Sequence, residues 1–388
     1  MKRKRNRMQS LIFILIPLAF CYYIGLQGWY CFKGVLPNSG RTVYWLLYWL
    51  LTLLPWLLQT FGSSVSSNVA EFGASLAFTQ LILYGSLFCF TLVFKVFFLI
   101  AVHGFGLTGL ARASLLPLWP MLVIALSLAV YIYGYHTAKT YAITPYQITL
   151  AGAATGEYKI AAISDLHLGV VHTRSELKKI IAAVNALDAD LVLILGDVLH
   201  SDYAPFRDHK MAEEFQNLTA PFGVYAILGN HDAYGNSEPQ LMAELTAAGI
   251  TMLQDKALVI DDSFILAGRK DRAGMRARAT NERAPVAELL QGFSADLPVI
   301  LMDHQPRDLQ ATAAEHKVDL QLSGHTHAGQ FWPVTWATDR IYELNYGYRQ
   351  IENTQFIVTS GIGTWGPAFR LGSISEIALI TLIIEAKQ

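Results

Sequence analysis

Cysteine is scarce in this chain and unevenly distributed. Only three cysteines are present, Cys21, Cys31 and Cys89, and none lies in the second half of the sequence. That half therefore has no disulfide, no thiolate metal ligand and no thiol nucleophile. Its chemistry has to use oxygen and nitrogen donors.

Charged residues are also few, at 15% of the chain, and the mean hydropathy of +0.34 is high for a soluble protein. Nearly all acidic residues, including every aspartate, lie after residue 135. This split predicts a multi-pass membrane domain over 1–135, a linker and first strand over 136–157, and a folded domain over 158–388. The net charge of −1 gives no reason to expect a nucleic-acid partner.

Four apolar stretches in the first domain have about the ~20 residues that a helix needs to cross a bilayer. They cover residues 8–26, 42–60, 76–101 and 114–134. We therefore expect about four transmembrane helices and the lipid bilayer as a partner. The basic start MKRKRNR resembles the first part of a signal peptide, but no small-residue cleavage site follows, so we expect an uncleaved anchor.

The side of the membrane follows from the basic residues near the first span. They favour a cytoplasmic N-terminus, and an even number of spans returns the chain to the same side. The prediction is thus a cell-membrane protein whose folded domain is cytoplasmic. A different number of spans would reverse this orientation.

The second half alternates short apolar runs with helix-like segments, without an internal repeat, which is typical of an α/β domain. Strands are predicted over 158–164, 190–195, 223–228, 263–268, 297–302, 318–323, 354–360 and 376–384, and helices over 175–187, 237–249 and 307–316.

Metal-binding residue types follow five of these strands. They are Asp165 and His167, Asp197, Asn230, His304, and the pair His325 and His327. The carboxyl ends of strands line the ligand crevice of open α/β sheets, so these donors can converge although the chain separates them widely.

Seven donors are more than one tetrahedral ion can bind, and they suit two divalent ions that share a carboxylate such as Asp197. Two ions ~3.5 to 4 Å apart polarise a phosphoryl group and activate water. His325 and His327 point to the same side of an extended segment, so we expect one of them on each ion. Imidazole, carboxylate and amide donors favour manganese, iron or zinc, and the ligands do not distinguish among these.

His231 follows the predicted ligand Asn230 and is expected to be a catalytic residue that binds no metal. An imidazole there can donate a proton to a departing alkoxide. We expect the neighbouring Asp232 to fix the tautomer of its ring.

The strings SDLHLG, GDVLHS, GNHDAYG, DHQP and GHTHAGQ, in this order, resemble the motifs of the calcineurin-like metallophosphoesterase superfamily over residues 158–388. The tail SGIGTWGPAFRLGSISEIALITL is similar to the membrane-associated bacterial branch, which includes UDP-2,3-diacylglucosamine pyrophosphatase-like and cell-wall-associated phosphodiesterase-like proteins. An animal relative with several spans before the same domain is also known.

This resemblance implies two mixed β-sheets packed as a sandwich and flanked by helices. It also implies a ligand set for each metal and His231 as the acid for the leaving group. The first metal would have Asp165, His167, Asp197 and His327, and the second would have Asp197, Asn230, His304 and His325. Ala328 departs from the pattern, because many relatives have a second glycine there.

Other polar residues have plainer interpretations. We expect the remaining histidines, among them His200, to be structural. The basic segment 268–283 contains Arg269, Lys270, Arg272, Arg276, Arg278 and Arg283, and two interpretations stay open for it. It is either a solvated loop, or it binds anions over the site or on lipid headgroups.

Two functions of different kinds remain. The first is a membrane-anchored, two-metal hydrolase of a phosphomonoester, phosphodiester or pyrophosphate, with a lipid-linked substrate as one option. The second is a transporter or sensor with a metal- or nucleotide-binding regulatory domain, against which the spans contain few ionisable residues. The sequence leaves the natural substrate, the metal and the oligomeric state undetermined.

Overall fold

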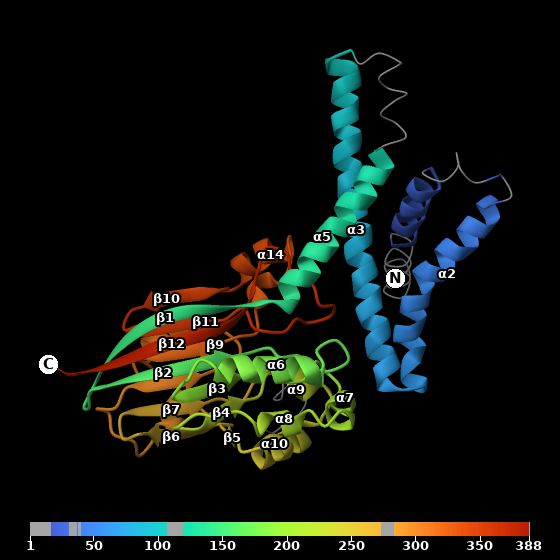
Figure 1. Ribbon diagram of the computed structural model, residues 1–388. Helices are drawn as coiled ribbons and strands as arrows, with labels where there is room; N and C mark the ends of the chain where they lie inside the picture. The colour runs from blue at the N-terminus through green and yellow to red at the C-terminus, as the bar shows by residue number, and fades with distance from the viewer. Residues whose placement is uncertain (1–16, 31–36, 38–39, 107–118, 273–282, 388) are drawn as a thin grey trace, which may run out of the picture. The chain divides into compact units, whose positions relative to one another are not determined.

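The computed structural model describes residues 17–30, 37, 40–106, 119–272 and 283–387 (Figure 1). The chain divides into two compact units, Met1–Tyr133 and Gly134–Gln388.

The described part of the first unit is almost entirely helical, and its last helix continues into the second unit. Residues 17–30 form a helix, followed by α2 (Gly40–Phe61), the short 3-10 helix η1 (Gly62–Ser64), α3 (Ser67–Gly104) and α5 (Trp119–Lys139). Within the described ranges, three segments are long and apolar enough to cross a membrane, Gly40–Ser64, Asn68–Gly104 and Trp119–Lys139. The first predicted span falls partly on residues 1–16, outside the described residues, so the number four stays a prediction.

The side chains of α2 face outward in the way that lipid requires. Leu46, Leu50 and Leu51 are 68%, 58% and 65% exposed. So much exposed aliphatic surface would be unfavourable in water, whereas a bilayer accommodates it. The protein is a membrane protein, as its apolar helices indicate.

The second unit contains two mixed six-stranded sheets with the strand orders β1-β12-β2-β3-β4-β5 and β10-β11-β9-β8-β7-β6. The first sheet consists of β1 (Tyr141–Gly152), β2 (Gly156–Ile163), β3 (Leu191–Leu195), β4 (Val224–Ile227), β5 (Thr251–Met252) and β12 (Ser375–Ala386). The second consists of β6 (Lys256–Ile260), β7 (Phe264–Gly268), β8 (Val299–Met302), β9 (Leu320–Ser323), β10 (Gly347–Ile351) and β11 (Thr354–Val358). The expected sandwich of two mixed sheets is confirmed.

The alternation of side chains along β3 explains why the sheets stack. Leu191, Leu193 and Leu195 belong to the core cluster that both sheets share, whereas Val192 and Ile194 belong to the cluster under the helices. Successive side chains of a strand point to opposite faces, so an uninterrupted apolar strand supplies both layers.

Helices cover the sheets, and Figure 1 shows α6, α8 and α10 beside the first one. The helical elements that lie between the strands of the second unit are α6 (Arg174–Asn185), α7 (Tyr203–Asp208), α8 (Ala212–Phe215), α9 (Asn230–Tyr234), α10 (Glu238–Ala247), α12 (Val286–Leu289), α13 (Leu309–Ala314), η2 (His327–Gly329) and α14 (Val334–Ile341).

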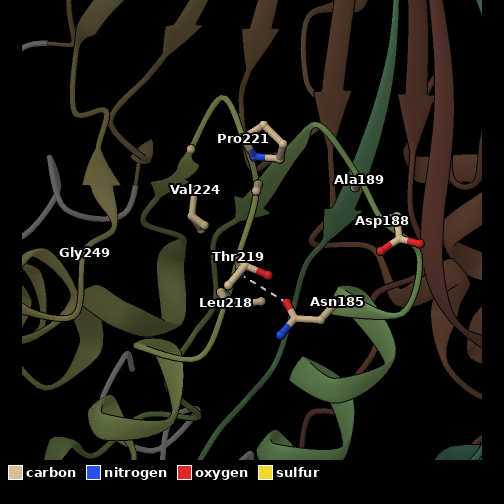
Figure 2. A pocket seen from close by; sticks show the side chains of 10 residues that line it. Asn185, Asp188, Ala189, Leu218, Thr219, Pro221, Val224 and Gly249 are labelled. Carbon is tan, nitrogen blue, oxygen red and sulfur yellow. Dashed lines mark hydrogen bonds between the residues drawn. The ribbon is translucent and has the colours of Figure 1, made fainter.

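A surface cavity of about 590 Å³ lies at the amino ends of β3 and β4 (Figure 2). Asn185 borders it and accepts a hydrogen bond from the backbone amide of Thr219 at 3.2 Å. None of the seven predicted metal ligands lines this cavity. The predicted ligands follow the opposite, carboxyl ends of the strands.

Candidate metal centre

The carboxyl ends of five parallel strands supply the candidate site. Strands β2, β3 and β4 are neighbours in the first sheet, and β8 and β9 are neighbours in the second. Four predicted ligands follow the strands of the first sheet: Asp165 and His167 after β2, Asp197 after β3 and Asn230 after β4. The other three follow the second sheet: His304 after β8, and His325 and His327 after β9. Stacking of the sheets brings the two sets of strand ends together.

One group of donors consists of Asp165, His167 and His327, all buried. The Nε2 atom of His327 lies 3.2 Å from Oδ1 of Asp165 and 3.0 Å from Nε2 of His167. Their donor atoms lie within 4.8 Å of one another, which is compact enough for one ion.

A second group consists of Asp197, His304 and His325, again within 4.8 Å. His304 Nε2 lies 3.1 Å from Oδ2 of Asp197, and the same carboxylate oxygen lies 3.9 Å from His167 Nε2 of the first group. The Asp197 carboxylate therefore lies between the two groups, where a bridging ligand would be.

The donor chemistry fits bound cations. His304 Nδ1 lies 2.7 Å from the backbone carbonyl of Leu195 and must donate to it, so in the neutral ring Nε2 is an acceptor that faces the Asp197 carboxylate. Two acceptors 3.1 Å apart need a proton or a cation between them. Asn230 adds a buried Oδ1 without a hydrogen-bond partner among the described residues, while its amide nitrogen donates to Tyr234 Oη at 2.9 Å. An acceptor left open in this way is suited to a metal ion.

The backbone at the predicted ligands is in the sparsely populated left-handed region. The φ angles are 56° at Asp165, 47° at His167, 53° at Asp197, 73° at His325 and 52° at His327. Such a conformation costs about 1 to 3 kcal/mol per residue and persists only where the surroundings enforce it. Non-glycine residues elsewhere in the described chain share it, but five of the seven predicted ligands have it, which is consistent with a functional constraint.

Two glycines permit the close approach of the donor groups. A Cβ atom on Gly229 would lie 2.2 Å from Asp197 Oδ1 and 2.7 Å from His304 Nε2, and one on Gly324 would lie 2.5 Å from Asp165 Oδ2. No side chain fits at these distances. The glycines of the GN and GH dipeptides thus leave space for the ligands that lie beside them.

Burial and neighbouring charges shift the pKa values of the carboxylates and histidines in the site. Burial disfavours the charged form of Asp165, but neighbouring His327 outweighs it and lowers the pKa of the carboxyl. Burial also opposes protonation of His304, yet Asp197 raises the pKa of this histidine well above its ordinary value. Burial, followed by the charge of His304, lowers the pKa of His325 to about 3.

The structure places His231 beside His167, but the predicted contact between Asp232 and the His231 ring is wrong. The ring of His231 packs on that of His167 with centroids 4.5 Å apart, and its Nδ1 is hydrogen-bonded to the carbonyl of His200. Asp232 accepts hydrogen bonds from the amides of Leu199 and Gly229, both at 2.8 Å. The carbonyl of His200 therefore fixes the tautomer of His231, and Asp232 holds the two loops together.

His200 lies at the site, although sequence reasoning treats it as structural. Its side chain forms a third group of possible ligands with His167 and His231, and its ring lies 5.6 Å from that of His167. Burial, then the charge of His231, lowers the pKa of His200 to about 4. The only signal in the sequence is its position three residues after Asp197.

Sequence reasoning also missed Arg370, which is fully buried behind His327. Its guanidinium donates to the carbonyls of Ser360 and Gly363, both at 2.7 Å, of Gly361 at 3.1 Å, and of His327 at 3.2 Å. Arg370 therefore joins the loop after β11 to the loop that carries His327.

The described ends of the basic segment 268–283 are tied down by carboxylates. Arg269 and Arg283 both pair with Asp303, and Arg272 pairs with Asp308. Arg269 and Arg283 are 14% and 6% exposed, so they pair inside the domain and are neither solvated nor open to an anion. Arg276 and Arg278 lie outside the described residues.

Comparison with known proteins agrees with this geometry. The sequence model of the family described as calcineurin-like phosphoesterase matches residues 158–329. A transmembrane protein with metallophosphoesterase domain from Danio rerio is 34% identical over 58% of this chain and 53% of its own length. An uncharacterized metallophosphoesterase from Helicobacter pylori is 31% identical over 58% of this chain and 60% of its own. One from Aquifex aeolicus is 31% identical over 58% of this chain and 85% of its own. The chain thus spans only about half of the first relative's length.

Proposed function

Since this chain belongs to the calcineurin-like phosphoesterase family, we propose that it is a membrane-anchored, metal-dependent hydrolase of phosphoester bonds. The observation that carries the proposal is the convergence of two compact donor groups on either side of one buried carboxylate, Asp197.

We propose two ligand sets for two divalent ions, of manganese, iron or zinc. Asp165, His167 and His327 would hold one, Asn230, His304 and His325 would hold the other, and Asp197 would be shared. Bound ions would supply positive charge for the phosphoryl oxygens and lower the pKa of a water molecule.

His231 is the proposed acid for the leaving group. Its Nδ1–H donates to the carbonyl of His200, so its Nε2 is the atom free to exchange a proton with substrate. The ring is only partly buried, whereas that of His167 is fully buried. The His231 ring can therefore contact the metal ligands on one side and a bound ester on the other.

The substrate class stays broad in this proposal and includes a phosphomonoester, a phosphodiester, a pyrophosphate or a lipid-linked phosphoester. We further propose that the catalytic unit lies on the cytoplasmic side, on the basis of the basic N-terminus. Protease treatment of sealed inside-out and right-side-out vesicles tests the orientation. Cleavage of the catalytic unit only in right-side-out vesicles would contradict it.

The activity is tested with the full chain purified in detergent and loaded with manganese. Hydrolysis of chromogenic phosphomonoester and phosphodiester substrates is measured for His327→Ala, His231→Ala and the control His316→Ala, whose side chain is 60% exposed on the surface. We expect His327→Ala to lose both metal and turnover. His231→Ala should keep its metal and lose about 10²- to 10⁴-fold in rate.

Full activity in both variants would contradict the proposed roles. Tight metal binding without turnover on either substrate would favour the sensor alternative.

A further inference from the structure

The helix α14 presents an aromatic and basic face that the rest of the catalytic unit leaves uncovered. Trp336 and Ile341 on α14 are 59% and 68% exposed, Trp332 just before the helix is 63% exposed, and no residue of α14 is buried. The guanidinium of Arg340 lies 3.7 Å from the ring centroid of Trp336. We call Trp332, Trp336, Arg340 and Ile341 the α14 stripe, and we propose that it docks on the lipid surface of the membrane that the apolar helices span.

The composition of the α14 stripe is that of an interfacial segment. Tryptophan is enriched where apolar and aqueous regions meet, and arginine extends its charged end toward headgroups while its stem stays apolar. Trp336 and Arg340 are one helical turn apart and also share a hydrogen bond, from Nη1 of Arg340 to the carbonyl of Trp336 at 2.9 Å. The stripe thus offers an apolar surface with a positive edge, which suits an anionic bilayer.

The direct connection of the catalytic unit to α5 supports the proposal. The helix α5 ends at Lys139 and β1 begins at Tyr141, so a single residue joins the apolar helix to the first sheet. Its last turns contain exposed Tyr133 and Tyr135, which are typical of the bilayer interface. The first strand of the catalytic unit therefore follows directly on an apolar helix.

A short chain of contacts connects the last turns of α5 to α14. The carbonyl of Gly134 accepts a hydrogen bond from the amide of Arg370 at 2.9 Å, and a Cβ on Gly134 would lie 2.2 Å from the Phe369 ring. The next residue, Leu371, accepts a hydrogen bond from the amide of Trp332 at 2.8 Å. The α14 stripe therefore starts one hydrogen-bonded segment away from Gly134, which lies about 7 Å along the helix from its end at Lys139.

The helix is fixed on its inner side, so the stripe has a defined direction. A Cβ on Gly329 would lie 2.3 Å from the Cα of Thr335 and 2.5 Å from Oγ1 of Thr338, which shows how closely α14 lies on the loop after His327. Trp336 and Arg340 are exposed and lie on the side of α14 that faces away from this loop.

Spin labels on the full-length protein test the docking. Cys21, Cys31 and Cys89 are replaced by alanine, and single cysteines are introduced as Trp332→Cys, Trp336→Cys and the control Val259→Cys on β6, which is 36% exposed. Each protein is reconstituted in nanodiscs of phosphatidylethanolamine and phosphatidylglycerol. Collision of the label with oxygen, which partitions into lipid, is compared with collision with a water-soluble nickel chelate.

Labels at 332 and 336 are expected to favour oxygen over nickel by a ratio several-fold above that at 259. A ratio equal to that of the control would place the stripe in water and overturn the proposal. Low accessibility to both reagents would also overturn it, because the stripe would then be covered by protein, either the helices of the same chain or a second copy. The readout does not depend on catalysis, so its failure is distinct from failure of the proposed function.

Discussion

Replacement of Arg370 by methionine removes a buried set of donors while it keeps most of the apolar volume. Arg370 donates to four backbone carbonyls, but two of these keep another donor. The carbonyl of His327 accepts from the amide of Gln330, and that of Gly361 accepts from the amide of Glu376. The carbonyls of Ser360 and Gly363 are the ones whose donor is lost.

The expected loss of stability follows from these two carbonyls. A buried acceptor without its donor costs about 1 to 3 kcal/mol, and part of that cost is regained because methionine needs no desolvation of a charge. Burial lowers the pKa of Arg370 to about 10, which still leaves it charged at neutral pH. We therefore expect the free energy of unfolding to fall by about 3 kcal/mol, and Tm to fall by about 6 to 12 °C.

Thermal unfolding of the full chain in detergent, followed by intrinsic fluorescence, measures the change. Arg349→Met is the matched control, because Arg349 is exposed and donates to the carbonyl of Glu343. The control should stay within about 0.5 kcal/mol. An Arg370→Met variant as stable as this control would refute the reasoning that Arg370 holds the two loops.

Three further predictions concern other parts of the catalytic unit. Ala328 has a φ of 50°, so Ala328→Gly should relieve left-handed strain and raise the free energy of unfolding by about 1 kcal/mol in denaturant titrations; an unchanged or lower value would contradict this. Burial raises the pKa of Glu176, but His172 and Lys139 outweigh it and bring the value from 4.5 down to about 2. The carboxylate therefore stabilises the fold above its unfolded pKa, and the Tm advantage over Glu176→Gln should be full above about pH 4.5 and shrink as the pH falls toward 2; an advantage that grows with acid would be inconsistent with this pairing. Gly229→Ala should reduce metal content measured by elemental analysis, because its methyl group would meet Asp197. Gly249→Ala strains the backbone, since φ is 93°, but its methyl group meets no atom and the metal should stay bound.

Much of the sandwich could be predicted because its central strands are apolar on both faces. All residues of β3 and β8 are buried, so their sequences are continuous apolar runs. The edge strand β10 is mostly exposed and β5 has two residues, so neither carries a usable pattern. Helices of four to six residues such as α8 and α7 are too short for a helical periodicity to appear.

The candidate site was predictable to the extent that it depends on strand ends. Parallel strands of one sheet place their carboxyl ends together, and this brings Asp165 and Asp197 into one region. His304 follows β8 of the other sheet and reaches them because the two sheets stack. The role of Asp232 was not predictable from adjacency. In α9 neighbouring side chains point about 100° apart, so Asp232 cannot orient the ring of His231 beside it. Arg370 reaches His327 across 43 positions by loop packing, for which the sequence has no periodic signal.

The central claim is that one buried carboxylate joins two metal ions. Electron paramagnetic resonance of the full chain loaded with manganese tests it most directly, because ions that share a ligand at ~3.5 to 4 Å are magnetically coupled. We predict a spectrum of exchange-coupled manganese that converts to that of isolated ions in Asp197→Asn. A spectrum of isolated ions in the unaltered protein, at saturating manganese, would contradict the account.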